Sequence, residues 1–192
     1  MKFYISDTHF GHENIIRHSK RPFANADEMD EKIIANWNSV VGPNDEVYIL
    51  GDLAYKGSKG PAYYLNRLNG KKYFLIGNHD NEIKNNIRKY ASYFEHGIIR
   101  DIFEIDDNGT RIVLCHYPMS EWNGMFRGAI HLYGHIHNNT ENDTYKRTSN
   151  TPNAYNVGAD ILDFTPRTLN EVIVMNKEFF KNHVAKWFFE TH

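Results

Sequence analysis

The stretch Leu132-Tyr133-Gly134-His135-Ile136-His137 joins a short apolar run to a glycine and two histidines. On an extended backbone, side chains two positions apart point to the same side, with their Cα atoms about 7 Å apart. His135 and His137 can therefore present two imidazoles to a metal ion. The same pair also occurs on protein surfaces without a metal, because a motif this short matches by chance. What the other segments bring to this place decides between the two readings.

Other short apolar runs end in the same way. The alternating, β-prone residues 2–6 lead into Asp7-Thr8-His9, and the apolar runs at 47–50 and 72–76 end at Gly51-Asp52 and at Gly77-Asn78-His79-Asp80. Continuous apolar runs of this length are typical of strands buried on both faces, and ligands of layered α/β folds bind beyond the carboxyl ends of such strands. This rule gathers eight side chains on one rim: Asp7, His9, Asp52, Asn78, His79, His116, His135 and His137.

The segments between these runs predict helices at first and strands later. Helical patterns cover residues 27–41 with Asp27 as N-cap, then 61–68 and 83–90. Residues 98–105 and 111–115 predict a strand pair around the turn at 106–109, residues 154–157 predict a strand, and residues 170–189 mix both signals. The order predicts an α/β layered fold with a mixed sheet or two packed sheets, in one domain spanning residues 1–192.

The composition sets limits on class and partners. The chain has 192 residues, 41% of them hydrophobic, a net charge of -2 and one cysteine, Cys115. These values predict a folded protein of a reducing compartment, the cytoplasm, because no signal peptide or membrane-spanning run is present. The weak negative charge gives no general attraction to nucleic acid. The sequence leaves a homodimer open.

The rim residues are suited to divalent transition metals. They comprise two carboxylates, one amide oxygen and several imidazoles without a thiolate, a set that fits manganese, iron, zinc, nickel or cobalt. The ligands are more numerous than one ion uses. We therefore expect two ions about 3.5 to 4 Å apart, bridged by a carboxylate.

At this point the sequence resembles a known family. The five blocks Asp7-x-His9, Gly51-Asp52, Gly77-Asn78-His79-Asp80, His116 and Gly134-His135-x-His137 are similar, in order, to the signature of the calcineurin-like metallophosphoesterases. Segments such as 10–16, 21–23, 36–38 and 156–160 resemble a small single-domain branch found in bacteria and phages. The resemblance implies a four-layer fold in which two packed, mainly mixed β-sheets are flanked by helices.

The resemblance also implies a division of roles. Asp7, His9 and His137 would hold the first metal, Asn78, His116 and His135 the second, and Asp52 would bridge them. The implied cofactors are two divalent ions, with manganese expected first and iron, zinc, nickel or cobalt as alternatives. A hydroxide between the ions would attack phosphorus, since metals lower the pKa of water to about 7.

The remaining expectations concern the substrate. His79, oriented by Asp80, would donate a proton to the leaving group, and Asn78, His79, His12 and Arg21 would contact the phosphate. A small phosphodiester such as a cyclic nucleotide is preferred, because the sequence lacks an obvious basic pocket for a dianion. Alternatives are a phosphomonoesterase, a nucleotide pyrophosphohydrolase, a peptidase or amidase, or a non-catalytic metal-binding scaffold.

Several side chains outside the blocks have less specific readings. Arg127 is a second candidate phosphate clamp, and His131 is expected to be structural. Tyr117, Trp122 and Phe126 fit either a wall beside the leaving group or core packing. Residues 138–192 receive no functional prediction.

Overall fold

Two four-stranded sheets face each other in the computed structural model, which describes residues 1–99 and 101–190, with side chains up to His183. The first sheet contains β1 (Lys2–Ile5), β2 (Glu46–Ile49), β3 (Lys71–Leu75) and β4 (Ile98–Ile99), and all its pairs are parallel. The second contains β5 (Phe103–Asp107), β6 (Thr110–Leu114), β7 (Ile130–Tyr133) and β8 (Ala154–Asn156). Its β5–β6 pair is antiparallel and its other two pairs are parallel.

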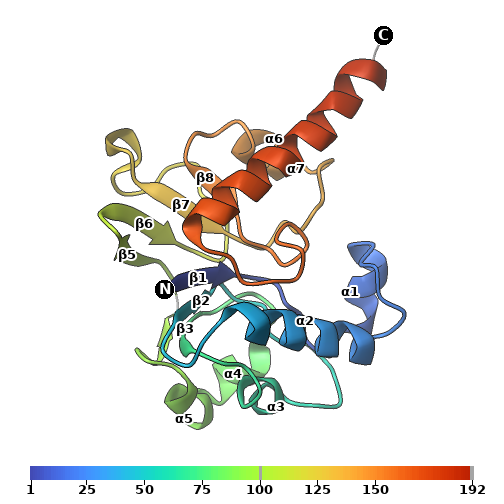
Figure 1. Cartoon of the computed structure of the whole chain (residues 1–192), viewed down its shortest axis with the longest axis vertical. Helices are drawn as coiled ribbons and strands as arrows, with labels where there is room; N and C mark the ends of the chain where they lie inside the picture. The colour runs from blue at the N-terminus through green and yellow to red at the C-terminus, as the bar shows by residue number, and fades with distance from the viewer. Residues whose placement is uncertain (100, 191–192) are drawn as a thin grey trace.

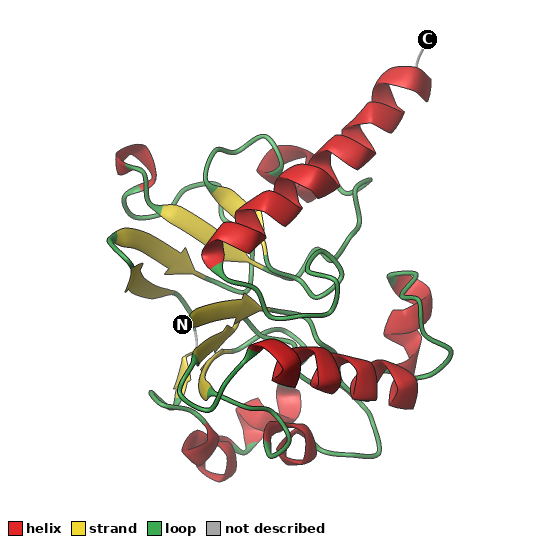
Figure 2. Cartoon of the chain, in the orientation of Figure 1, coloured by secondary structure: helices red, strands yellow, loops and turns green. Residues whose placement is uncertain are grey.

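Helices lie on the outside of this pair of sheets (Figures 1 and 2). The described helices are α1 (Glu13–His18), α2 (Ala26–Val40), α3 (Pro61–Leu65), α4 (Asn81–Asn85), α5 (Ile87–Tyr90), α6 (Asp143–Thr148) and α7 (Leu169–Glu190), with short 3-10 turns at Ala91–Tyr93 and Met125–Arg127. α2 packs on the outer face of the first sheet, and α7 contacts β1 and β8 at the edge where the two sheets meet.

Alternation along the strands of the first sheet builds two cores at once. In β1, Phe3 and Ile5 belong to the core shared with α2, whereas Tyr4 points into the core between the sheets. In β2, Val47 and Tyr48 divide in the same way. Side chains of successive strand residues point to opposite faces, so a strand covered on both sides must be apolar throughout. The continuous apolar runs of the sequence follow from this.

The prediction of two packed sheets flanked by helices is confirmed, with the mixed pairing confined to the second sheet. The predicted strand over 98–105 is wrong, because Ile98 and Ile99 pair with β3 in the first sheet while Phe103 begins β5 in the second. The predicted helix over 83–90 is divided at Asn86, and α2 is capped by Asn25, whose side chain accepts from the Glu28 N–H, rather than by Asp27. Residues 170–189 lie within α7.

The topology brings the carboxyl ends of six strands to one rim. β1, β2 and β3 run parallel in the first sheet, and β6, β7 and β8 run parallel in the second. A parallel bridge between Ser6 and Gly158 aligns the two sets. All loops that carry the predicted ligands therefore leave the sheets on the same side.

No helix in the described part of the chain is long and apolar enough to cross a bilayer.

Candidate metal centre

Asp7 lies at the centre of the rim, fully buried in the loop after β1. Its Oδ2 accepts a hydrogen bond from the backbone N–H of His135 at 2.9 Å. This contact depends on Gly134, because a Cβ at that position would collide with Ser6 Oγ and Asp7 Oδ2. The glycine before His135 is thus explained by a close approach of two loops, one from each sheet.

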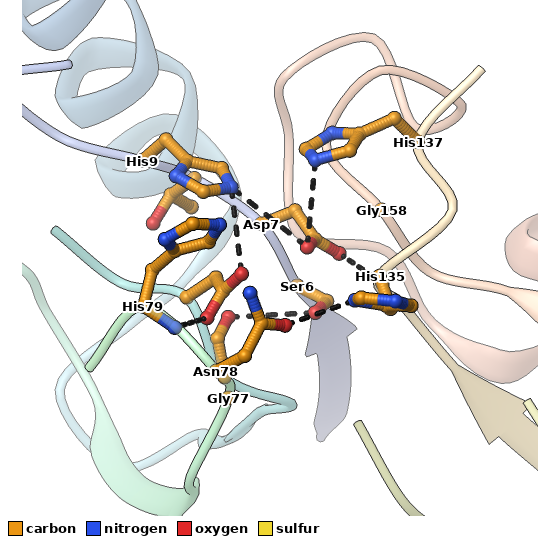
Figure 3. Close-up of polar contacts among 12 residues, drawn as sticks. Ser6, Asp7, His9, Gly77, Asn78, His79, His135, His137 and Gly158 are labelled. Carbon is orange, nitrogen blue, oxygen red and sulfur yellow. Dashed lines mark hydrogen bonds and ion pairs between the residues drawn. The ribbon is translucent and has the colours of Figure 1, made fainter. Parts of the chain in front are cut away.

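The first group of ligand atoms surrounds the other oxygen of Asp7. Asp7 Oδ1 lies 4.0 Å from His9 Nε2 and 4.0 Å from His137 Nε2. Figure 3 shows the rings of His9 and His137 on either side of Asp7. Asp7 Oδ1 and His9 Nε2 are buried without any hydrogen-bond partner. Buried polar atoms are rarely left unpaired, so these two atoms indicate a cation between them.

The second group converges on the side-chain oxygen of Asn78. His116 Nε2 and His135 Nδ1 each lie 2.9 Å from Asn78 Oδ1. Asp52 connects the two groups, since its Oδ2 lies 3.6 Å from both His9 Nε2 and His116 Nε2. Its Oδ1 accepts from the His79 backbone N–H at 2.7 Å. One oxygen of Asp52 is thus held by the backbone while the other faces both groups.

Hydrogen bonds at Nδ1 of His116 and His137 leave the Nε2 atom of each ring free to bind a metal. His116 Nδ1 lies 2.7 Å from the Leu50 carbonyl, and His137 Nδ1 lies 2.8 Å from Asp160 Oδ2. A proton on each Nδ1 leaves the lone pair of Nε2 for a metal. Burial, together with the negative charges of Asp7 and Asp80, raises the pKa of Asp52 to about 8. A bound cation relieves this crowding of negative charge, so the residues present fit two divalent ions.

The backbone of this rim is strained. Five ligands adopt left-handed φ angles: Asp7 (55°), His9 (52°), Asp52 (53°), His135 (71°) and His137 (50°). Such conformations are uncommon in residues with a Cβ and persist only where the surrounding structure enforces them. Their concentration at one rim marks it as a functional site.

The family comparison agrees with this geometry. A family model described as calcineurin-like phosphoesterase matches residues 3–139, which carry every predicted ligand. The chain belongs to the calcineurin-like phosphoesterase family.

Three relatives extend this assignment. The uncharacterised protein MJ1445 of Methanocaldococcus jannaschii is 35% identical over 173 residues, covering 89% of this chain and 88% of that protein. The gene 66 protein of Mycobacterium phage L5 is 29% identical over 159 residues, covering 70% and 76%. The structure of AQ665, a protein of unknown function from Aquifex aeolicus, is similar with a TM-score of 0.70 and 27% identity, covering 91% of this chain and 98% of that one.

Arg21 does not line the pocket beside His9 and His137, contrary to its predicted role as a phosphate clamp. Its guanidinium is buried, with Nε 2.9 Å and Nη2 3.1 Å from the two carboxylate oxygens of Asp160. It also donates to the backbone carbonyls of Asp7 and Thr8 at 2.7 and 2.9 Å. A fifth hydrogen bond runs from Nη1 to Met29 Sδ at 3.4 Å, so the guanidinium has no donor left for a substrate phosphate. Arg21 instead holds the ligand loop after β1 in place through the carbonyls of Asp7 and Thr8.

Asp160 is the functional residue that the sequence reading missed. It lies in the loop after β8 and accepts from His137 Nδ1. Burial alone would lower the pKa of His137, but this hydrogen bond and the charge of Asp7 raise it above the usual value. A more basic ring is a stronger metal ligand. The one sequence feature that points to Asp160 is its place in the segment 156–160, which resembles the family branch but predicts no specific role.

Asp80 also has contacts that differ from the expected ones. Its Oδ2 accepts from the backbone N–H groups of Asp52 and Gly77 at 2.7 Å each, and its Oδ1 accepts from Leu53 N–H at 3.0 Å. Both carboxylate oxygens are therefore used by backbone amides rather than by the His79 ring. The structure supports a role in holding the Asp52 loop, and not the predicted orientation of His79.

His79 and His12 lie together at the mouth of the centre. The His79 ring is 5.4 Å from that of His9 and 4.5 Å from Tyr55, and Tyr55 is in turn 4.7 Å from His12. Burial lowers the pKa of His79, and burial followed by the charge of His79 lowers the pKa of His12 to about 4. Both rings line a groove of about 1030 Å³ that opens from the metal centre. Their predicted contacts with substrate remain predictions.

The other candidates separate by burial. Tyr117 is 46% exposed and its ring lies 4.9 and 4.7 Å from those of His116 and His135, so it can form a wall beside the second group. Trp122 is buried in the core outside the second sheet, and Phe126 is 85% exposed. His131 is fully buried in β7, where Nδ1 lies 3.0 Å from the Val113 carbonyl and Nε2 accepts from Met119 N–H, so it contacts no metal ligand.

Proposed function

We propose that this protein is a dinuclear metal-dependent phosphodiesterase. One observation carries the proposal: Asp52 Oδ2 lies 3.6 Å from an imidazole nitrogen of each ligand group, at His9 and at His116. A carboxylate oxygen shared between two sets of donors is the arrangement that a pair of neighbouring cations requires.

The two sets would hold the ions as follows. Asp7, His9 and His137 would bind the first, Asn78, His116 and His135 the second, and Asp52 both. When bound, such ions supply Lewis acidity toward the phosphate oxygens and activate water near neutral pH. The chain's own contribution is to fix these donors before substrate arrives, through the hydrogen bonds of Asp7, Asp80 and Asp160.

His79 is assigned the proton transfer to the leaving group. Its backbone N–H is bonded to Asp52, which fixes the residue beside the ligands, while its ring faces the groove. Burial lowers the pKa of His79 in the free protein. An anionic phosphate ester beside the ring favours the protonated imidazole, which then donates a proton from the ring to the leaving oxygen.

The preference for diesters rests on space and charge. The groove of about 1030 Å³ beside His79 leaves room for a second substituent on phosphorus. Arg21, which contacts the loop of Asp7, has its donors committed to Asp160 and to backbone carbonyls. The second negative charge of a monoester therefore has no arginine partner among the contacts of the described ligands. Both features favour a monoanionic scissile phosphate.

The test compares two esters of one leaving group. Protein incubated with manganese is assayed against bis-p-nitrophenyl phosphate and p-nitrophenyl phosphate, with peptide p-nitroanilides as a third arm. We expect the highest kcat/KM for the diester. A monoester rate far above the diester rate would overturn the diester assignment, and turnover of the peptides alone would indicate an amidase. Full metal content without any turnover would indicate a binding scaffold.

A further inference from the structure

The groove beside the metal centre is much larger than one phosphate requires. Its lining extends from His9 and His79 past residues of α1 and of the loop at 136–142 to His183 on α7. Its volume of about 1030 Å³ lies at the upper end of the range for sites that take a whole small molecule, about 300–1000 Å³. Most of the groove therefore receives a part of the substrate other than the phosphate at the metals.

The lining of the groove is rich in cations and amides. Lys20 and Lys56 line it from two different loops, and neither forms an ion pair with any described residue. Glu141 is the one carboxylate among the described lining residues. The four lining asparagines, which offer neutral hydrogen bonds, are Asn14, Asn138, Asn139 and Asn142. The chain as a whole has a net charge of -2, so this positive balance is local.

Both lysines are held in an unfavourable backbone conformation. Lys20 has a φ of 53° and Lys56 a φ of 52°, and no other described lysine or arginine has a positive φ. Glycine and asparagine adopt this conformation more readily, because the Cβ atom of other residues makes a positive φ sterically unfavourable. Of the nine other described non-glycine residues with a positive φ, five are proposed metal ligands. The two lysines of the groove thus share the left-handed conformation of the metal-ligand loops.

The neighbours of these lysines fix them relative to the metal centre. Lys20 precedes Arg21, which is anchored to Asp160 and to the loop of Asp7. Lys56 follows Tyr55, whose backbone N–H donates to Phe10 O at 3.0 Å, and Lys56 Nζ lies 4.9 Å from the centre of the Tyr55 ring. Each loop that carries a lysine is thus tied to the loop that carries His9. The backbone that carries each lysine is therefore anchored to the metal centre.

We propose that the groove is a second anion subsite, in which Lys20 and Lys56 bind an additional phosphate group of the substrate. The substrate is then a phosphodiester with a second phosphate in the same molecule, joined through a polar unit that the asparagines can contact. A nucleoside bisphosphate ester and a short nucleotide chain share this chemistry. The inference rests on the proposed function, because the scissile phosphate must occupy the metal centre.

The test uses two substrates that differ in one phosphate. Manganese-incubated protein is assayed against thymidine 5′-(p-nitrophenyl phosphate) with either a free or a phosphorylated 3′ oxygen. Each exposed charge pair contributes roughly a factor of three, so we expect a KM about tenfold lower for the 3′-phosphorylated ester. This ratio should shrink as NaCl rises from about 0.05 M to about 0.5 M. A third ester with the 3′ phosphate joined to another thymidine separates the sources: the same gain indicates a nucleotide chain, and a gain confined to the terminal phosphate indicates a bisphosphate.

Variants assign the effect to the two lysines. In the double variant Lys20→Ala/Lys56→Ala the ratio of the two KM values should fall to about one. The matched control is Lys32→Ala, an exposed lysine on α2 that does not line the groove, which should keep the wild-type ratio. Equal KM values in the wild-type protein, or a ratio that survives the double substitution, would overturn the subsite.

Failure of the proposed function gives a different result. If neither ester is hydrolysed, the diesterase assignment fails, and the subsite is then tested by calorimetric titration with thymidine 3′,5′-bisphosphate and thymidine 5′-phosphate. About tenfold tighter binding of the bisphosphate, lost in the double variant and retained in Lys32→Ala, would support the subsite without any turnover. Equal affinities would refute it.

Discussion

The two sheets contribute different chemistry to the metal centre. The loops after β1, β2 and β3 supply the oxygen ligands of Asp7, Asp52 and Asn78 together with one imidazole, His9. The loops after β6 and β7 supply imidazoles, at His116, His135 and His137. Neither sheet alone carries the complete set of ligands proposed for either ion. The centre therefore exists only where the two sheets are packed together.

The two sides are also held in place differently. On the first sheet the ligand loops bond to one another through the backbone, as in Asp7 N–H to Gly51 O and His9 N–H to Asp52 O, each at 3.0 Å. On the second sheet the imidazoles are oriented through their ring nitrogens, as in His116 Nδ1 with the Leu50 carbonyl and His137 Nδ1 with Asp160. We expect substitutions on the first side to disrupt both metals, and substitutions on the second side to weaken one.

The largest effect is expected at Asp52, the residue common to both groups. Asp52→Asn removes the shared charge, and because Lewis-acid stabilisation is worth several kcal/mol, kcat should fall about 10³-fold or more. Metal analysis should show both ions bound more weakly. Asp106→Asn, an exposed residue near the end of β5, is the control and should leave both values unchanged. Normal metal content and activity in Asp52→Asn would contradict the shared role.

A large effect with metals retained is expected at His79, which belongs to the first side but is not a ligand. His79→Ala should lower kcat by about 10² to 10⁴ for a substrate with an alkoxide leaving group, since a general acid contributes this much. The loss should be smaller with nitrophenolate, which leaves without a proton. An unchanged rate with the alkoxide substrate would remove His79 from the mechanism.

A smaller effect is expected on the second side, at Asp160. Asp160→Asn keeps the shape of the side chain but removes the charge that raises the pKa of His137. Affinity for the first metal should fall about 10- to 100-fold while the second is unaffected. Competition with a metal-sensitive dye measures the dissociation constants of the two metals. Asp163→Asn, exposed in the same loop, serves as control; equal weakening of both sites would refute the division between the two sides.

The smallest effect concerns stability and pH, through His131 in the second sheet. Burial lowers the pKa of His131, so the folded state binds its proton less readily than the unfolded state. The contribution of His131 to the free energy of unfolding should be constant above about pH 6.5. Below that pH it should fall as pH decreases, by at most about 1.4 kcal/mol per pH unit. Urea unfolding between pH 7.5 and about pH 5 measures it.

Substitution isolates this contribution. His131→Gln should show a flatter dependence on pH than the wild-type protein, even if its stability is lower throughout. His18→Gln, which changes an exposed imidazole, should keep the wild-type slope. Parallel curves for wild-type protein and His131→Gln would show that His131 is not buried as a neutral ring.

The sequence predicted the parts of the site that local pattern encodes. Ligands at strand ends follow from apolar runs that stop at Gly51 or Gly77, and the topology rule then places them together. The division of residues 98–105 between two sheets has no such local signal, because Ile98 and Phe103 are equally suited to either. Register between distant strands is decided by tertiary packing.

Arg21 and Asp80 show why the sequence does not predict which residues hold the ligand loops in place. Both are charged residues next to signature blocks, which suggested contact with the substrate. Their partners are distant in sequence: Asp160 lies 139 positions from Arg21, and the Asp52 amide lies 28 positions from Asp80. Whether a charged side chain faces a groove or a buried backbone amide depends on packing that residue types alone do not specify.

The central claim is that two cations share this rim, and metal stoichiometry tests it most directly. Protein incubated with manganese and then dialysed is analysed for bound metal per chain, alongside Asp52→Asn and Asp106→Asn. We predict two manganese ions per chain in the wild-type protein and in Asp106→Asn, with both depleted in Asp52→Asn. One ion or fewer per wild-type chain would contradict the dinuclear centre.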